Sequence, residues 1–356
     1  MDSTSMSRQI MEQGKSAVLS LERSAAEITR VAEELKDFDK FILSGAGDKY
    51  IVPMISQFLW RRLSDRPVDV IHSRTLADYV PRYVGRDTCC IFLTQSGKTK
   101  DTIDAINQVA MRGAKCIAIT NLKEKEGVHN LCETVRTHTV TYPEKATPST
   151  GTFHSSLAVM NEIIIQAFGD KRWGEAHREV LRIADSLSKN KELIQWSEST
   201  AKEMLKHDGS SFYFIGDGPR FPVAKKAATI MFYEGAKHDA CAVETEEFVH
   251  SLIETLEDEN RHKKPMVVLQ PLKSQITDFS YRQLESIKKM WWEKAPMFVV
   301  NPFDFCEEVG GEAGNLLSPP LYAVQTIWLA FHFAMARGVD PGVTHMVGKV
   351  RSGSSV

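Results

Sequence analysis

Two short loops hold residues whose types suit the binding of an anion. The first spans 44–49 and contains Gly45, Gly47 and Lys49, where an apolar run ends and a helical pattern begins. Glycine turns let backbone N–H groups approach an anion closely, and the N-terminus of a helix favours negative charge. We therefore expect these three residues to contribute to a phosphate site.

The second loop, residues 94–99, adds hydroxyl groups at a similar junction. Thr94, Ser96 and Thr99 place three hydroxyls within six residues, with Gln95 beside them. Hydroxyls, free N–H groups and a helix N-terminus together favour a phosphate. The alternative is that Ser96 and Thr99 only cap the helix that follows.

Neither loop matches a nucleotide-binding motif. The first lacks the last glycine of G-x-G-x-x-G because position 50 is Tyr50, and the chain has no G-x-x-x-x-G-K-[ST] run. A dinucleotide or P-loop interpretation is therefore weak. We expect the protein to need no cofactor.

A carboxylate and an imidazole form a second candidate site. Glu234 ends an apolar helical stretch, and His250 follows sixteen residues later. A positioned carboxylate can act as a general base and an imidazole as a general acid, which are the two groups that a proton transfer needs. Two alternatives stay open: both side chains are solvated or structural, or His238, Glu246 and His250 form a metal site of poor spacing.

The elements that must position these residues alternate between strand and helix. Such alternation predicts a parallel sheet with helices on both faces. The strand-length runs are continuously apolar, as expected for strands buried on both faces. Strands are predicted at 41–47, 68–73, 89–97, 115–121, 211–218, 265–271 and 296–302, and helices at 6–36, 50–63, 99–112, 219–234 and 321–336.

The pattern restarts near residue 211, which predicts two α/β domains in tandem, each a flavodoxin-like three-layer sandwich. A length of 356 residues suits two domains. The predicted divisions are an N-terminal helix at 1–38, a first domain at 39–170, a helical connector at 171–207, a second domain at 208–340 and a tail at 341–356.

Composition narrows the class of protein. A net charge of -2 argues against a nucleic-acid-binding surface. The sequence contains no run of about 18 apolar residues, so no membrane-spanning helix is predicted. The N-terminal residues are polar and lack the apolar core of a secretory signal. The six cysteines form no C-x-x-C pair, which favours reduced cysteines in a cytoplasmic protein.

Three segments resemble the sugar isomerase (SIS) family. TQSGKTKDT at 94–102 resembles the phosphate-binding signature S-Q-S-G-x-T-x-D-T, and PSTGTFHSSL at 148–157 resembles the segment A-S-T-K-x-F-T-x-Q-L that closes the sugar site. GDGPRFPVAKKAATIMFYE at 216–234 is similar to a segment of the second SIS domain. The resemblance implies two tandem SIS domains that bind a phosphosugar.

The resemblance also implies roles for particular residues. Glu234 matches the catalytic base, and His250 matches a ring-opening histidine that the neighbouring subunit supplies, which implies a homodimer with shared sites. Ser149 would lie near the phosphate. Lys349 matches a tail lysine that enters the active site, where it could polarise a carbonyl or form an imine.

Several functions fit these residues. The leading hypothesis is a fructosamine-6-phosphate deglycase, because the EEFVH segment at 246–250 resembles deglycases and deaminases more than the synthase. An amino-sugar-6-phosphate deaminase or a plain aldose–ketose isomerase is the alternative. Without a preceding glutaminase domain, we do not expect a complete glucosamine-phosphate synthase. A phosphosugar-sensing protein is a further alternative, although a sensor would not need Glu234.

Overall fold

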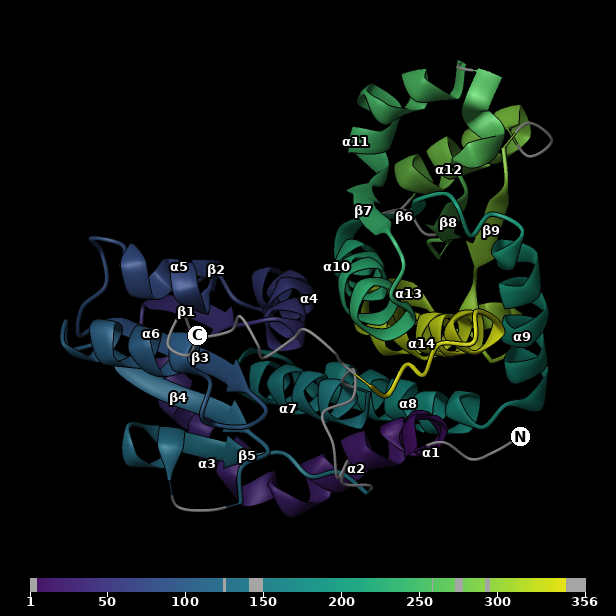
Figure 1. Cartoon of the computed structure of the whole chain (residues 1–356). Coiled ribbons are helices and arrows are strands. Elements are labelled where there is room, and N and C mark those ends of the chain that lie inside the picture. The colour runs from purple at the N-terminus through teal and green to yellow at the C-terminus, as the bar shows by residue number, and fades with distance from the viewer. Residues whose placement is uncertain are drawn as a thin grey trace. The chain divides into compact units, whose positions relative to one another are not determined.

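A computed structural model gives the fold, and it describes residues 5–123, 126–140, 150–257, 259–272, 278–291 and 295–343. The chain divides into two compact units, coloured from purple to yellow along the sequence in Figure 1. We call residues 12–142 with 149–182 the N-terminal unit, and residues 1–11, 143–148 and 183–356 the C-terminal unit. Among the described helices, none is both long and apolar enough to cross a bilayer.

The predicted helix at 6–36 is broken into successive helices. They are α1 (Ser5–Met11), α2 (Gln13–Arg23) and α3 (Ala25–Glu34), followed by the 3-10 turn η1 (Leu35–Asp37). Ser24 leaves the helical conformation with φ -109° and ψ 12°, and its hydroxyl donates to the Arg136 carbonyl. A serine side chain that bonds to distant backbone competes with helix continuation, which accounts for the second break.

The N-terminal unit is built on a five-stranded parallel sheet in the order β2-β1-β3-β4-β5. This is a flavodoxin-like order. Every residue of β3 is buried, as a strand covered on both faces requires. The strands are β1 (Lys40–Gly45), β2 (Val68–His72), β3 (Thr88–Thr94), β4 (Lys115–Thr120) and β5 (Glu133–Arg136).

Helices cover both faces of this sheet (Figure 1). On one face Phe41 packs on Trp60 of α4 and on Phe168 of α7, with ring centroids 4.5 and 6.3 Å apart. On the other face Cys90 and Phe92 join a core with residues of α5 and α6. The elements are α4 (Asp48–Leu63), α5 (Ser73–Asp78), α6 (Lys100–Ala110), the 3-10 turn η2 (Gly127–Asn130) and α7 (Gly151–Phe168), and α8 (Lys171–Ser188) contains the division between the units.

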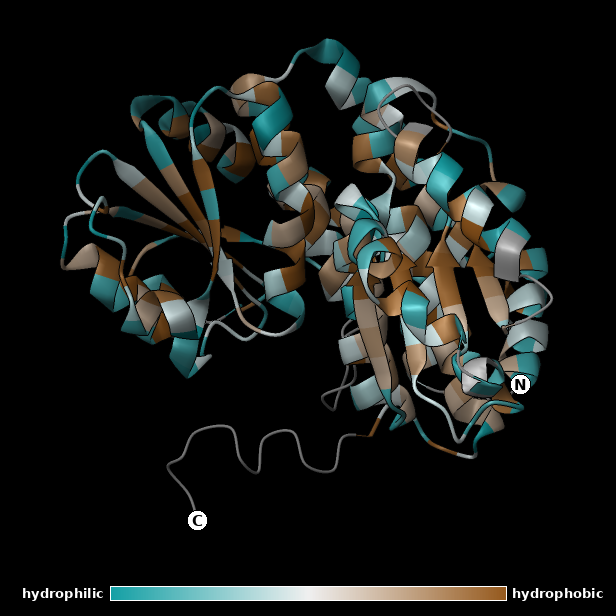
Figure 2. Cartoon of the chain, turned by 90° about the horizontal axis from the view of Figure 1, so that it is seen from above, coloured by the Kyte–Doolittle hydropathy of each residue, from teal (hydrophilic) through white to brown (hydrophobic). Residues whose placement is uncertain are grey.

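The C-terminal unit is built on a four-stranded parallel sheet in the order β7-β6-β8-β9. Hydrophobic residues, brown in Figure 2, concentrate in the strands. Residues of α11, η5 and α12 form the core on one face, and α14 packs with α9 and η4 on the other. The strands are β6 (Phe212–Gly216), β7 (Ala240–Glu244), β8 (Met266–Leu269) and β9 (Met297–Val300).

Two helices of this unit depart from the ordinary amphipathic type. The predicted helix at 219–234 is a 3-10 turn, a short α-helix and then a ten-residue π-helix, which is a rare form often found at functional sites. Helix α14 is buried along nearly its whole length, so it is a core helix that is apolar all round. The elements are α9 (Lys191–Leu205), η3 (Gly218–Arg220), α10 (Phe221–Lys226), the π-helix η4 (Ala227–Ala236), α11 (Thr245–His250), η5 (Leu252–Glu257), η6 (Glu259–Lys263), α12 (Asp278–Trp291), η7 (Pro302–Asp304), α13 (Gly311–Leu317) and α14 (Pro319–Ala336).

Candidate active site

Both predicted anion loops lie at the point where the strand order of the first sheet reverses. Strands β1 and β3 are neighbours, and the helices that follow them, α4 and α6, cover opposite faces. Open α/β sheets bind ligands at such switch points, beyond the carboxyl ends of the strands. The two loops are therefore neighbours at the edge of the sheet where a ligand is expected.

The first loop needs its glycines for different reasons. A Cβ on Gly45 would lie only 2.3 Å from the Lys49 carbonyl oxygen, so a side chain cannot fit there. Gly47 has φ +57°, in the left-handed region that favours glycine, and open space around its Cα. The loop can therefore make its tight turn into α4 only with glycine at position 45.

Lys49 is placed differently from a solvent-facing phosphate ligand. Its side chain is buried, and its ammonium donates to the Thr152 carbonyl at 2.7 Å, with an Asp48 carboxylate oxygen at 3.7 Å. This contact ties the start of α4 to the start of α7. The ammonium is paired with the Asp48 carboxylate, and its role as a direct phosphate ligand stays a prediction.

The second loop gathers its hydroxyls closely. Thr99 Oγ lies 3.5 Å from Thr94 Oγ and 3.4 Å from Ser96 Oγ. The Thr94 oxygen accepts from the Gly97 N–H at 3.2 Å, and the Ser96 oxygen accepts from the Lys98 N–H at the same distance. Each hydroxyl that accepts from the backbone keeps its own proton to donate, which suits an anion above the loop.

The helix that follows this loop also favours an anion. Thr99 is the N-cap residue of α6, yet its side chain makes no capping hydrogen bond to the helix. The simple capping alternative is therefore not supported for Thr99. Ser96 is exposed and Thr99 is half-buried, so both hydroxyls can be reached from solvent. An anion at this place would meet the positive end of the α6 dipole.

Thr152 connects the two loops through the start of α7. Its carbonyl accepts a hydrogen bond from the Lys49 ammonium, and its hydroxyl donates to Gln95 Oε1 at 3.3 Å. The segment predicted to close the sugar site thus does approach both loops at Thr152. Ser149 lies outside the described residues, so its placement near the phosphate stays a prediction.

Sequence reasoning missed a buried row of hydroxyls behind the loops. Ser73 Oγ lies 3.1 Å from Ser44 Oγ and 3.5 Å from Thr102 Oγ, and all three side chains are buried. These contacts join β1, α5 and α6. The signal was a serine or threonine at each of three strand or helix ends, but only the fold brings them together.

Glu234 lies in the last turn of the π-helix η4. Its side chain is half-buried, and the neighbouring Phe232 is buried against Phe333 with the ring centroids 5.1 Å apart. Since η4 leads into β7, Glu234 lies toward the amino edge of the second sheet. The catalytic role of this carboxylate stays a prediction.

His250 ends α11, which follows the carboxyl end of β7. Glu234 and His250 therefore lie toward opposite edges of the same sheet, separated by a five-residue strand, or about 17 Å. The His250 side chain is 71% exposed, and its Nε2 lies 3.2 Å from Glu246 Oε1. Within this unit the two predicted catalytic residues do not share a site.

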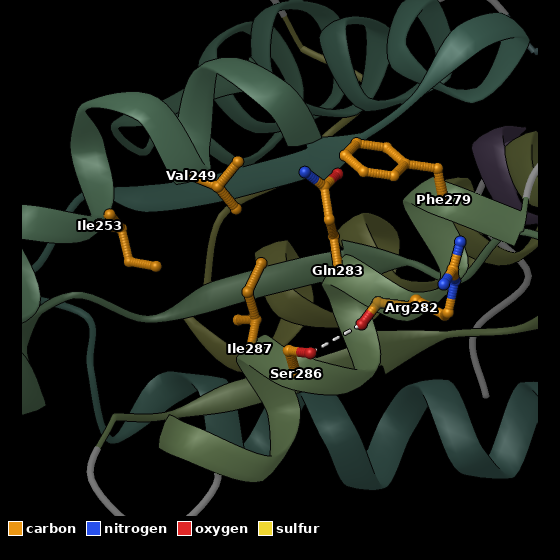
Figure 3. Close-up of a pocket in the computed structure, with 7 residues that line it drawn as sticks. All are labelled: Val249, Ile253, Phe279, Arg282, Gln283, Ser286 and Ile287. Carbon is orange, nitrogen blue, oxygen red and sulfur yellow. Dashed lines mark hydrogen bonds between the residues drawn. The ribbon is translucent and has the colours of Figure 1, made fainter.

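A surface pocket of about 320 Å³ lies beside the helix that carries His250. Figure 3 shows Val249 and Ile253 on one side of it and residues of α12 on the other. Gln283 also donates to Glu246 at 2.8 Å, which joins α12 to α11. The lining residues are Val249, Ile253, Phe279, Arg282, Gln283, Ser286 and Ile287.

The alternative of a metal site at His238 is wrong. His238 is buried, and its ring nitrogens lie 2.7 Å and 2.9 Å from the carbonyl oxygens of Asp208 and Asp239. Its ring also packs against Phe212, with the centroids 5.2 Å apart. It is a structural histidine, and no cluster of three or more metal-ligating side chains occurs among the described residues.

Comparison with known proteins assigns the first unit to a family. Residues 23–165 match the SIS domain family model, a range that includes both anion loops and most of α7. The chain contains a SIS domain. The segments TQSGKTKDT and PSTGTFHSSL predicted this assignment from the sequence. The matched range contains the residues that the sequence predicts for the phosphate site, whose role stays a prediction: Gly45, Gly47, Lys49, Thr94, Gln95, Ser96 and Thr99.

Curated relatives extend the similarity beyond the SIS domain. A glutamine–fructose-6-phosphate aminotransferase (isomerizing) from Thermococcus kodakarensis is 26% identical over 348 residues, covering 94% of this chain and 56% of the relative. The protein of the same name from Pyrobaculum aerophilum is 28% identical over 352 residues, covering 94% of this chain and 55% of the relative. The chain thus spans about half the length of the curated relatives that it matches.

Solved structures share the fold of the whole chain. The C-terminal domain of glucosamine-fructose-6-phosphate aminotransferase from Francisella tularensis superposes with a TM-score of 0.77, covering 95% of this chain and 98% of that one at 16% identity. Glucosamine-6-phosphate deaminase from Thermotoga maritima gives 0.70, covering 92% and 97% at 16% identity. The two-sheet α/β fold predicted from the sequence is confirmed.

Proposed function

We propose that this protein is a phosphosugar enzyme, most specifically a fructosamine-6-phosphate deglycase that releases glucose 6-phosphate and an amine. One observation carries the proposal: three hydroxyls and an uncapped helix N-terminus converge at the switch point of the SIS domain. This arrangement offers several hydrogen-bond donors to a dianion. The curated relatives are named for fructose 6-phosphate, which supports a six-carbon phosphosugar as the substrate class.

The chemistry needs one proton shuttle and one water molecule. In an open-chain fructosamine 6-phosphate, Glu234 would take a proton from C1 and return it to C2, leaving an imine between C1 and nitrogen. Water then adds to C1 and the carbon–nitrogen bond breaks, which gives glucose 6-phosphate and the free amine. His250 would first protonate the ring oxygen so that the sugar opens.

A panel of three substrates distinguishes the candidate reactions. A fructosamine 6-phosphate would yield glucose 6-phosphate and amine in a deglycase. Glucosamine 6-phosphate would yield fructose 6-phosphate and ammonia in a deaminase, which is the second candidate because a solved glucosamine-6-phosphate deaminase shares the fold. Fructose 6-phosphate would interconvert with glucose 6-phosphate in a plain isomerase. Turnover of the last two compounds but not the first would contradict the deglycase.

Replacing Glu234 by glutamine tests the base. Glu234→Gln keeps the shape of the side chain and removes its basicity, so turnover should fall about 10²- to 10⁴-fold. In deuterated water the wild type should place deuterium at C1 or C2 of the product, and the variant should not. Phosphosugar binding, measured by thermal shift, should persist. Near-normal turnover by this variant would remove Glu234 from the mechanism.

The separation of His250 from Glu234 supports a site shared between two subunits. We propose a homodimer in which each His250 serves the other subunit. Mixing inactive Glu234→Gln with inactive His250→Ala should restore activity, because some mixed dimers contain one intact site. Full activity from a protein that sediments as a monomer would refute the shared site.

A further inference from the structure

The end of the π-helix that carries Glu234 has an unusual residue in its C-cap position. Lys237 has φ 53° and ψ 45°, and among the described residues it is the one non-glycine with a positive φ. Glycine adopts this left-handed conformation without steric cost. What a lysine adds at this position is an ammonium group at the end of the helix.

That ammonium closes the end of the helix. Lys237 Nζ donates to the carbonyl of Glu234 at 2.6 Å and to that of Gly235 at 3.1 Å. These are among the last carbonyls of the helix, which lack intrahelical partners. A cation at a helix C-terminus is also favoured by the helix dipole.

A second cation completes the closure from the end of α14. Arg337 Nη1 donates to the carbonyl of Ala236 at 2.6 Å and to that of Lys237 at 3.1 Å. Its Nε pairs with Asp208, and its guanidinium lies 6.0 Å from the Phe333 ring. Four successive carbonyls of the π-helix end are thus held by two cations, which we call the clasp (Lys237 and Arg337).

The clasp also holds the chain that leaves α14. Gly338 ends the helix with φ +70°, and an Asp340 carboxylate accepts from the Gly342 N–H at 2.8 Å in the turn that follows. The carbonyl of the next residue, Val343, accepts a hydrogen bond from Lys237 Nζ at 2.6 Å. One ammonium therefore binds the backbone of both Glu234 and Val343, and these two segments must lie side by side.

We infer that Lys237 is a positioning residue that fixes the base of the C-terminal tail beside Glu234. The two contacts of its ammonium hold the described start of the tail, through Val343, beside the end of the helix that carries Glu234. This inference rests on the proposed function for its catalytic consequence, but the contact itself does not.

The electrostatics of the clasp agree with a structural rather than a solvated lysine. Burial lowers the pKa of the Lys237 ammonium, and the carboxylates of Glu234 and Asp340 act against that shift. The side chain is half-buried, and its three carbonyl contacts use all three N–H donors. Lys237 is therefore engaged entirely with the backbone and has no donor left for substrate.

Two variants at position 237 separate loss of the clasp from misfolding. Lys237→Met removes the ammonium and keeps a long side chain. Lys237→Gly also removes it but relieves the left-handed strain, so its melting temperature should match or exceed that of Lys237→Met. Lys206→Met is the control, because Lys206 is an exposed lysine of the same unit that pairs only with Glu203 in its own helix.

Hydrogen exchange tests the contact in the full-length protein. Both Lys237 variants should exchange the amides of residues 338–343 about tenfold faster, as expected from losing a charge-assisted hydrogen bond. On the substrate that the wild type turns over, kcat should fall about 10- to 100-fold while KM changes less than about twofold, because a misplaced group slows the chemical step. Lys206→Met should change neither quantity.

The outcomes distinguish this inference from the proposed function. Wild-type exchange rates at 338–343 in folded Lys237→Gly would overturn the clasp. Faster exchange with an unchanged kcat would overturn its positioning role. If the wild type turns over no phosphosugar, the proposed function fails, and the exchange result alone decides whether Lys237 holds the tail.

Discussion

Thr99 offers the sharpest test of the phosphate site, because its hydroxyl makes only weak contacts within the folded protein. Its two contacts in the loop are long, at 3.4 and 3.5 Å, and it makes no capping bond to α6. Thr99→Val keeps the shape and removes the hydroxyl. We expect the free energy of unfolding to change by less than about 1 kcal/mol.

The effect on binding should be much larger. A hydrogen bond to a charged group contributes about 1.5–3 kcal/mol, which corresponds to a loss of affinity of about 10- to 150-fold. At a ligand concentration 100 times the wild-type Kd, binding stabilises the folded state by about 2.7 kcal/mol. A 100-fold weaker Kd would leave about 0.4 kcal/mol, so the thermal shift should almost vanish.

The assay compares fructose 6-phosphate with fructose by calorimetry and thermal shift. Thr29→Val is the matched control, since Thr29 is an exposed threonine of α3 whose hydroxyl bonds only to Gln166. It should leave phosphosugar affinity unchanged. Equal affinity of Thr99→Val and the wild type for fructose 6-phosphate would refute the placement of the phosphate on this loop.

Two further predictions concern stability. Gly45→Ala would force a Cβ to 2.3 Å from the Lys49 carbonyl oxygen, and it should cost about 1–3 kcal/mol in urea unfolding and abolish phosphosugar binding. Gly47→Ala makes no steric contact and is strained only by the positive φ, so it should lower the free energy of unfolding by about 1 kcal/mol. Burial lowers the pKa of His332 in the folded protein below its ordinary value of 6.5. As the pH falls below 6.5, this histidine is protonated more in the unfolded chain than in the folded one, so the free energy of unfolding should fall. His332→Leu should flatten that fall; an unchanged profile would contradict it.

The central strands could be predicted because burial on both faces leaves a continuous apolar signal. β1, β3, β6 and β8 were all found this way, and β3 and β8 are buried at every residue. The edge strands β5 and β7 were missed. The sequence of β5, ETVR, has no apolar run. In β7 the run Ala240–Val243 is apolar but short, and it was not assigned to a strand.

The candidate site was predictable only as far as local chemistry reaches. Glycines and hydroxyls at strand ends identified both loops from the sequence. The burial of Lys49 against Thr152 could not be predicted, because 103 residues separate the two along the chain. The π-helix was equally hidden, since the apolar pattern of residues 227–236 is compatible with an ordinary α-helix.

The two units share a parallel-sheet architecture, but the loop after β6 in the C-terminal unit differs from the anion loops of the N-terminal unit. In the C-terminal unit, the loop after β6 is occupied by its own side chains: buried Arg220 pairs with Asp217 at 2.8 Å and donates to Asn315 at 2.6 Å, with its guanidinium 6.0 Å from the Tyr322 ring. Arg220 Nη2 makes no hydrogen bond, but the whole side chain is buried, so it presents no donor to an anion in solvent. The equivalent edge of the N-terminal unit instead leaves hydroxyls open to solvent. We therefore expect the first unit, and not the loop after β6 in the second, to bind the phosphate.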